Sequence, residues 1–153
     1  MKINDVHSGI VWSKLEQALL DSAKKGDYNN LGEEMDCPAE RQCERRVRAT
    51  LVRYLLLGGS NEENGATTHE KGVLLSGAWI DGELDFSGCE TKLECKFANC
   101  LFTSKIIFRD SQILGLQMIG GRAEEEIDLL RIKTTASIGF IRGNPPIFNG
   151  VHL

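Results

Sequence analysis

The residues best suited to chemistry in this chain are its cysteines and histidines, because these side chains bind metals and, as thiolates or imidazoles, attack substrates. No two cysteines stand in a Cys-x-x-Cys arrangement and the histidines are scattered, so the ligand spacing of a zinc site is missing. The odd number of cysteines favours reduced thiols. These residues are Cys37, Cys43, Cys89, Cys95, Cys100, His7, His69 and His152. We therefore expect no metal centre and no cofactor.

Motifs of the common catalytic classes are also missing from the sequence. There is no Gly-x-Ser-x-Gly turn, and the glycine-rich segment 58–65 has no lysine for a phosphate and carries two glutamates that would repel one. Ser104 and Lys105 are adjacent but have no identified oxyanion partner. A lyase-like β-helix would need acids, bases or metal ligands stacked on one face, and none align. We expect a protein that is not an enzyme.

Acidic residues form two groups that could bind a partner. Asp81, Glu83 and Asp85 alternate along a predicted strand, so all three should face outward and form a solvated rim. The run Glu124, Glu125 and Glu126 is the densest charge cluster. Its simplest interpretation is a loop or a corner between strands, and its functional interpretation is a partner-binding patch.

The segment from Arg41 to Arg53 contains five arginines, which could form a face for phosphate or nucleic acid. Acids and bases balance over residues 1–59, so a solvated helix face with Glu44 paired to Arg48 is the simpler interpretation. The net charge of the chain is −4, which argues against general affinity for nucleic acid or anionic membrane. No apolar run approaches 20 residues and no signal peptide is evident, so we expect a cytoplasmic protein without a membrane segment.

Two predicted helices make up a cap over residues 1–59. The first has capping-box spacing from Ser13 to Glu16, with Ser8 as an alternative cap, and Gly26 is its expected end. The second should start at Pro38 and end at Gly58. Their apolar stripes recur at helical spacing. The stripe residues are Val11, Leu15, Ala18, Leu19, Val47, Leu51, Tyr54 and Leu55.

Beyond a polar linker at residues 60–71, residues 72–153 repeat with a period of 22 and then 21 residues. Leu75 steps to Phe97 and Met118, and the last step takes Leu114 roughly to Ile138 and Leu116 to Phe140. Repeats this short cannot bury their own apolar face, whereas stacked coils can. The predicted inward columns contain Leu84, Ile106 and Ile127, and Phe86, Phe108 and Leu129.

These features predict a mainly β protein, a right-handed β-helix of about four coils of 21–22 residues behind an α-helical N-terminal cap. Each coil should have four short sides, with corners near Gly77, Asp81, Gly82 and Gly88, because glycine and aspartate tolerate unusual backbone angles. Cys89, Cys95 and Cys100 should pack inward as small apolar residues. The C-terminal end of the stack stays open, so either the chain is part of a longer protein or that end pairs with a second subunit as a homodimer.

Two segments carry a family resemblance. The helical segment 44–58, ERRVRATLVRYLLLG, and the first repeat 75–89, LSGAWIDGELDFSGC, resemble a bacterial family of pentapeptide-repeat-like proteins. There a helical head precedes repeats of the form Leu-x-Gly-Ala-x-Ile-x-Gly-x-Leu-Asp-Leu-Ser-Gly-Ala. The resemblance covers roughly residues 40–130 and implies a solenoid. Some members are labelled membrane-associated oxidoreductases, but this sequence has no dinucleotide fingerprint, metal-ligand set or membrane segment.

The expected function is a protein-interaction or scaffolding module with an unidentified protein partner. Trp79 lies between inward Ala78 and Ile80, so it should face outward, where tryptophan often anchors a partner. The alternative is a DNA-mimic inhibitor or regulator of a DNA-binding enzyme such as a topoisomerase, as some pentapeptide-repeat proteins are. A net charge of −4 is a weak field for that role.

Overall fold

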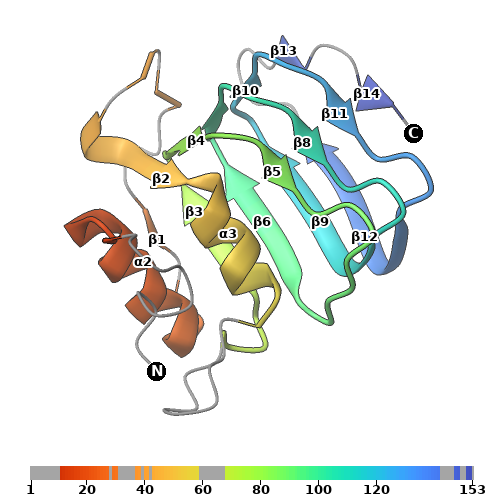
Figure 1. Cartoon of the computed structure of the whole chain (residues 1–153), viewed down its shortest axis with the longest axis horizontal. Helices are drawn as coiled ribbons and strands as arrows, with labels where there is room; N and C mark the ends of the chain where they lie inside the picture. Colours follow the sequence, from red (N-terminus) through yellow and green to blue (C-terminus); the bar gives the residue numbers. More distant parts are fainter. Residues whose placement is uncertain are drawn as a thin grey trace.

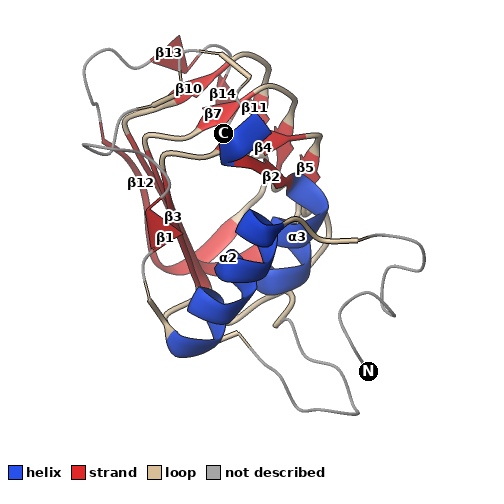
Figure 2. Ribbon diagram, turned by 90° about the vertical axis from the view of Figure 1, so that its left-hand side faces the viewer, coloured by secondary structure: helices blue, strands red, loops and turns tan. Residues whose placement is uncertain are grey.

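The computed structural model describes residues 11–27, 29–30, 37–38, 40–41, 43–58, 68–141, 147–148 and 151–152. Over these residues the chain winds into a β-solenoid of about three turns, with parallel strands and two helices (Figure 1). The predicted solenoid is therefore confirmed, while the expectation of four coils is not. The helices α2 and α3 lie at the end of the solenoid that β1 and β2 occupy (Figure 2).

Three parallel sheets form the walls of the solenoid, each built from one strand per turn. The first sheet contains β1 (Asn29–Asn30), β3 (Val73–Ser76), β6 (Glu94–Ala98), β9 (Gln112–Ile119) and β12 (Lys133–Ile141). The second contains β2 (Arg46–Arg48), β4 (Trp79–Asp81), β7 (Leu101–Phe102), β10 (Arg122–Ala123) and β13 (Ile147–Phe148). The third contains β5 (Leu84–Asp85), β8 (Ile106–Ile107), β11 (Ile127–Asp128) and β14 (Val151–His152). The expectation of four sides is wrong, because each turn spends its residues on one longer strand and two short ones.

The helical N-terminal region is only partly as predicted. Helix α2 (Lys14–Lys25) begins at Ser13, whose side chain accepts from the Glu16 backbone N–H in the expected capping box, and it ends at left-handed Gly26. The second helix is much shorter than expected, since α3 spans only Ala49–Leu56 and follows a 3-10 turn (Cys43–Arg45) and strand β2. Pairing of β2 with β4 outweighs helix formation there. A purely helical cap is therefore not confirmed, because β1 and β2 extend two walls of the solenoid.

Helix α3 lies beside β5, in the place that a strand of the third sheet would take. The Arg53 Nε donates to the backbone oxygen of Asp85 at 3.0 Å. The Thr68 and Thr91 hydroxyls donate to the Leu55 and Leu56 carbonyls, which the helix leaves without partners at its C-terminal end. Most of the predicted linker, residues 60–67, lies outside the described residues.

The predicted repeat register is confirmed over most of its length. Strand pairing places Leu75 opposite Phe97 and Phe97 opposite Met118. Ile106 pairs with Leu84 on one side and with Ile127 on the other. The last predicted step is wrong, since Ile138 pairs with Leu116 and not with Leu114. The cause is a bulge between Thr134 and Ser137, which adds one residue to β12.

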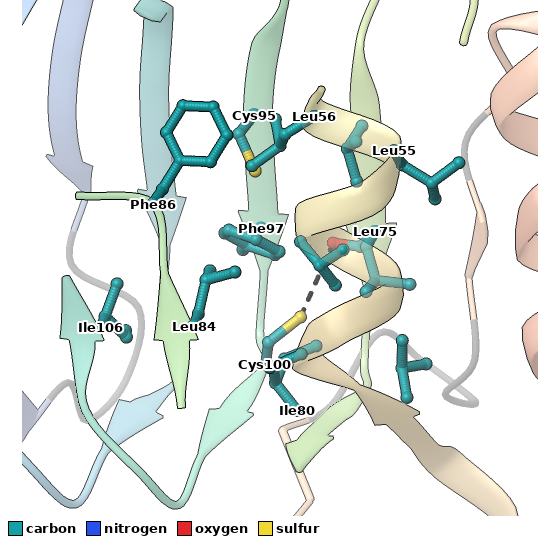
Figure 3. Close-up of a cluster of buried hydrophobic side chains, with 14 of the residues drawn as sticks. Leu55, Leu56, Leu75, Ile80, Leu84, Phe86, Cys95, Phe97, Cys100 and Ile106 are labelled. Atoms are coloured by element: carbon teal, nitrogen blue, oxygen red, sulfur yellow. Dashed lines mark hydrogen bonds between the residues drawn. The ribbon is translucent and has the colours of Figure 1, made fainter. Parts of the chain in front are cut away.

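The inward columns form a single apolar core (Figure 3). All six predicted core residues are buried, and the Phe86 and Phe108 ring centroids are 5.6 Å apart. Cys95 and Cys100 are buried as expected, while Cys89 is only half-buried. Burial raises the pKa of the Cys100 thiol to about 12, so this thiol stays protonated near neutral pH. The six residues are Leu84, Phe86, Ile106, Phe108, Ile127 and Leu129.

Left-handed residues stack at two corners of successive turns. Gly88, Asp110 and Arg131 repeat at the same 22- and 21-residue steps with φ of 66°, 54° and 55°. Gly77, Asn99 and Gly120 form the second such column. Predicted corners at Gly77, Gly82 and Gly88 are therefore confirmed. The Asp110 carboxylate bonds the Arg131 guanidinium of the next turn, which helps to hold two side-chain-bearing residues in a conformation that normally favours glycine.

A buried ion pair fastens α2 to the first strand of the second sheet. The Glu16 side chain is 2% exposed, and its carboxylate accepts from the Ser13 N–H, the Arg48 N–H and the Arg48 Nε, each at 2.9 Å. Arg48 Nη2 also donates to this carboxylate at 2.6 Å, and its Cζ lies 4.7 Å from the Trp12 ring centroid. Burial alone would raise the pKa of Glu16, but the bonds from Arg48 and Ser13 outweigh it and lower the pKa.

The core register predicts a large loss of stability from the change Phe108→Ala. Removing a ring that is fully buried and stacked on Phe86 leaves a cavity, which should lower the free energy of unfolding by about 3–5 kcal/mol in urea titrations. Phe108→Leu keeps most of the volume and should cost less. Exposed Lys105→Ala is the control and should stay within about 0.5 kcal/mol of the parent. A Phe108→Ala protein as stable as this control would contradict the register.

The Glu16–Arg48 pair predicts an acid-sensitive contribution to stability. Because folding lowers the pKa of Glu16, its contribution is present above the carboxyl's ordinary pKa and is lost as the pH falls through the folded-state pKa. Glu16→Gln should cost about 3 kcal/mol at pH 7 and flatten the stability curve on the acid side. Unfolding curves between neutral and acidic pH measure this, with exposed Glu44→Gln as the matched control. Equal acid sensitivity in the parent and Glu16→Gln proteins would count against the pair.

Candidate binding site

The expected anchor, Trp79, is not available as an exposed ring. Its side chain lies on the outer side of β4 as the alternation predicts, but it is only 7% exposed. The indole Nε1 donates to the Thr103 Oγ1 of the next turn at 3.0 Å, and the Arg46 guanidinium carbon lies 6.0 Å from the ring centroid. The expectation of an exposed anchor at Trp79 is therefore wrong, because neighbouring turns cover a ring that points outward.

The acidic run Glu124, Glu125 and Glu126 lies at the corner between β10 and β11, as its simpler interpretation predicted. Glu124 and Glu125 are exposed and Glu126 is half-buried. Glu124 bonds Arg122 at 3.4 Å. The structure brings this carboxylate to the turn after Thr103, the partner of Trp79, because the Glu124 N–H donates to the Phe102 carbonyl. A partner-binding role for the run stays a prediction.

Arginines of one turn pair with acids of another around the walls. Arg46 Nε lies 2.6 Å from the Asp81 carboxylate, and Arg109 Nη2 lies 2.7 Å from that of Asp128. The predicted helical pairing of Glu44 with Arg48 is wrong, because residues 43–48 form no α-helix and Arg48 binds Glu16. The alternating signs split the surface into small patches of both charges.

Within the described residues, no group of three or more histidines, cysteines, aspartates and glutamates could hold a metal ion. Over the same ranges, none of the helices has the length and apolarity needed to cross a bilayer.

The surface feature that sequence reasoning missed is a groove at the corner where the third sheet leads into the first. It consists of two adjacent hollows, which we call the corner groove. The first, of about 440 Å³, lies between the end of α3 and the following turn, and is lined by Leu57, Gly58, Thr68, Glu90, Thr91, Lys92 and Leu93. The second, of about 350 Å³, lies between later turns, and is lined by Glu90, Thr91, Lys92, Gln112, Ile113, Leu114 and Thr135.

Leucines supply the apolar surface of the corner groove. Leu57 is 45% exposed, and within the described residues only it and Val11 are exposed large hydrophobic side chains. Leu93 and Leu114 are half-buried and lie on successive turns, where the Leu114 N–H donates to the Leu93 carbonyl at 3.2 Å. The groove thus offers aliphatic side chains from three successive levels of the stack, in a surface that is otherwise polar.

The walls of the groove are held by hydrogen bonds from fixed backbone. Thr91 donates through its hydroxyl to the Leu56 carbonyl and accepts at the same oxygen from the Leu93 N–H at 3.2 Å. Its own N–H donates to the Gln112 carbonyl at 2.8 Å. Thr91 therefore joins the helix end, its own turn and the next turn, so the groove exists without a partner to shape it.

Irregular register accounts for the hollows. Glu90 pairs with Gln112 and Glu94 with Gly115, so four steps on one turn face three on the next. The bulge in β12 repeats this mismatch opposite Ile113 and Gly115. One extra residue per turn bends the chain away from its neighbour. A signal was present in the sequence, since Leu93 and Leu114 form an apolar column at the 21-residue step just where the spacing becomes irregular.

The lining suits binding by burial of apolar groups, with Glu90 and Lys92 as exposed charges of opposite sign at the rim. Comparison with known proteins supplies no further assignment: no family model, curated protein or solved structure matches this chain.

Proposed function

We propose that this chain is a non-catalytic protein-interaction or scaffolding module that presents the corner groove to a protein partner. The observation that carries the proposal is Leu57, exposed at 45% beside half-buried Leu93. Exposed apolar side chains gathered in a concave site are typical of binding surfaces. Repeat solenoids bind partners along such surfaces because their stacked turns are rigid.

The proposal includes the finer features that the family resemblance implies. We propose a right-handed solenoid of the pentapeptide-repeat-like kind, with a fourth coil completed around β12, β13 and β14, and a cytoplasmic location. Support comes from the parallel stacking at 21–22 residues and from the apolar columns that the resemblance shares. A regulator of a DNA-binding enzyme is a weaker candidate, because Asp81 and Asp128 are paired with arginines and no continuous acidic stripe results along these columns.

The test is a quantitative pull-down with the tagged full-length chain from a lysate of the cells that express it. Leu57→Ser removes the exposed apolar side chain from the groove, and Val11→Ser removes the other one, 78% exposed, at a distant site. A partner bound through the groove should fall about tenfold with Leu57→Ser, the equivalent of about 1.4 kcal/mol, and stay unchanged with Val11→Ser.

Thermal unfolding of both variants checks that neither loses the fold, since neither side chain belongs to the buried core. Equal recovery of every protein by the parent and by Leu57→Ser would contradict a role for the groove. Enrichment of a topoisomerase that is indifferent to Leu57→Ser would favour the DNA-mimic alternative instead.

A further inference from the structure

The corner groove also indicates the kind of segment that it accepts. Its two hollows follow one another along the axis of the stack and share the lining residues Glu90, Thr91 and Lys92, which form a ridge between them. Adjacent turns are about 4.8 Å apart, and the first hollow is bounded by a helix end, which widens the step. Side chains on one face of an extended peptide repeat about every 6.7 Å. Two residues at i and i+2 therefore match the two hollows.

Each hollow offers an aliphatic surface of the size of one side chain. Leu57 and Leu93 line the first hollow, and Leu114 lines the second beside buried Ile113. The remaining lining is largely threonine, whose hydroxyls in the first hollow are already bonded to the end of α3. These hollows therefore select apolar groups, since a polar side chain placed there would lose water without gaining a strong partner.

The ridge adds a charge preference. Glu90 and Lys92 are exposed, carry opposite signs and, within the described residues, have no ion-pair partner. They stand two residues apart along the chain, on either side of Thr91. A segment that crosses the ridge passes a carboxylate and an ammonium, and it is complementary if it carries a basic group near the first and an acidic group near the second.

Resting on the proposed function, we infer that the corner groove binds an extended peptide segment of a partner protein with aliphatic residues at i and i+2, flanked by one basic and one acidic residue. The opposite rim charges fix the direction in which the segment lies. The ordered walls around Thr91 mean that the chain itself undergoes little reorganisation on binding, so the cost of ordering falls on the peptide.

Two synthetic peptides test this directly, Lys-Leu-Ser-Leu-Glu and Glu-Leu-Ser-Leu-Lys, each with glycine-serine ends and blocked termini. They are titrated into the full-length chain while its backbone amides are followed by NMR. One peptide should bind more tightly than the other, by about threefold for each exposed charge pair, and should shift the amides of the groove. Those amides belong to Thr91, Lys92, Leu93, Gln112 and Leu114.

The double exchange Glu90→Lys with Lys92→Glu should reverse the preference between the two peptides, whereas Glu125→Lys, an exposed acid at another corner, should leave it unchanged. No shifts with either peptide, or a preference that survives the exchange, would overturn the inference. Shifts of the same amides on raising the protein concentration alone would overturn it in favour of a second copy of this chain. A pull-down partner that depends on Leu57 would leave the proposed function standing in each of these cases.

Discussion

The strands of this solenoid find their hydrogen-bond partners one turn away along the chain, and this constraint governs the rest of the structure. Several strands are only two residues long and have no stability alone. They persist because each turn places Ile106 or its equivalent between the same positions of the neighbouring turns. The core columns, the left-handed corners and the ion pairs between turns all follow from that register, so an error in it would misplace every wall at once.

The sequence predicts what repeats and misses what depends on distant partners. The columns of Phe86 and Phe108 were predictable because polarity and size recur at one spacing. The segment Arg46–Arg48 alternates polar and apolar residues, which suits a helix stripe and a strand equally, and the choice is made by β4 and by Glu16, both about 30 residues away. The outward direction of Trp79 was likewise predictable, whereas its cover by Thr103 was not.

The candidate site arises where the repeat is imperfect. A perfectly regular stack would bring Leu93 and Leu114 into an even wall, but extra residues at the corner separate the turns and leave hollows between them. Thr91 holds this irregularity in place by bonding three different levels of the stack. The regular register thus provides rigidity and its local breaks provide shape, which is why a binding module can be built without catalytic residues and why a motif search does not reveal it.

The register itself is measured most directly by NMR, through contacts between backbone hydrogens of strands that lie far apart in the sequence. The structure predicts cross-strand contacts from Ile106 to Leu84 and to Ile127, and from Leu116 to Cys95 and to Ile138. It also predicts that the amide of Leu114 lies near Leu93, at the edge of the groove. Contacts from Ile106 or Leu116 at any other spacing would contradict the stack and, with it, the groove that the stack supports.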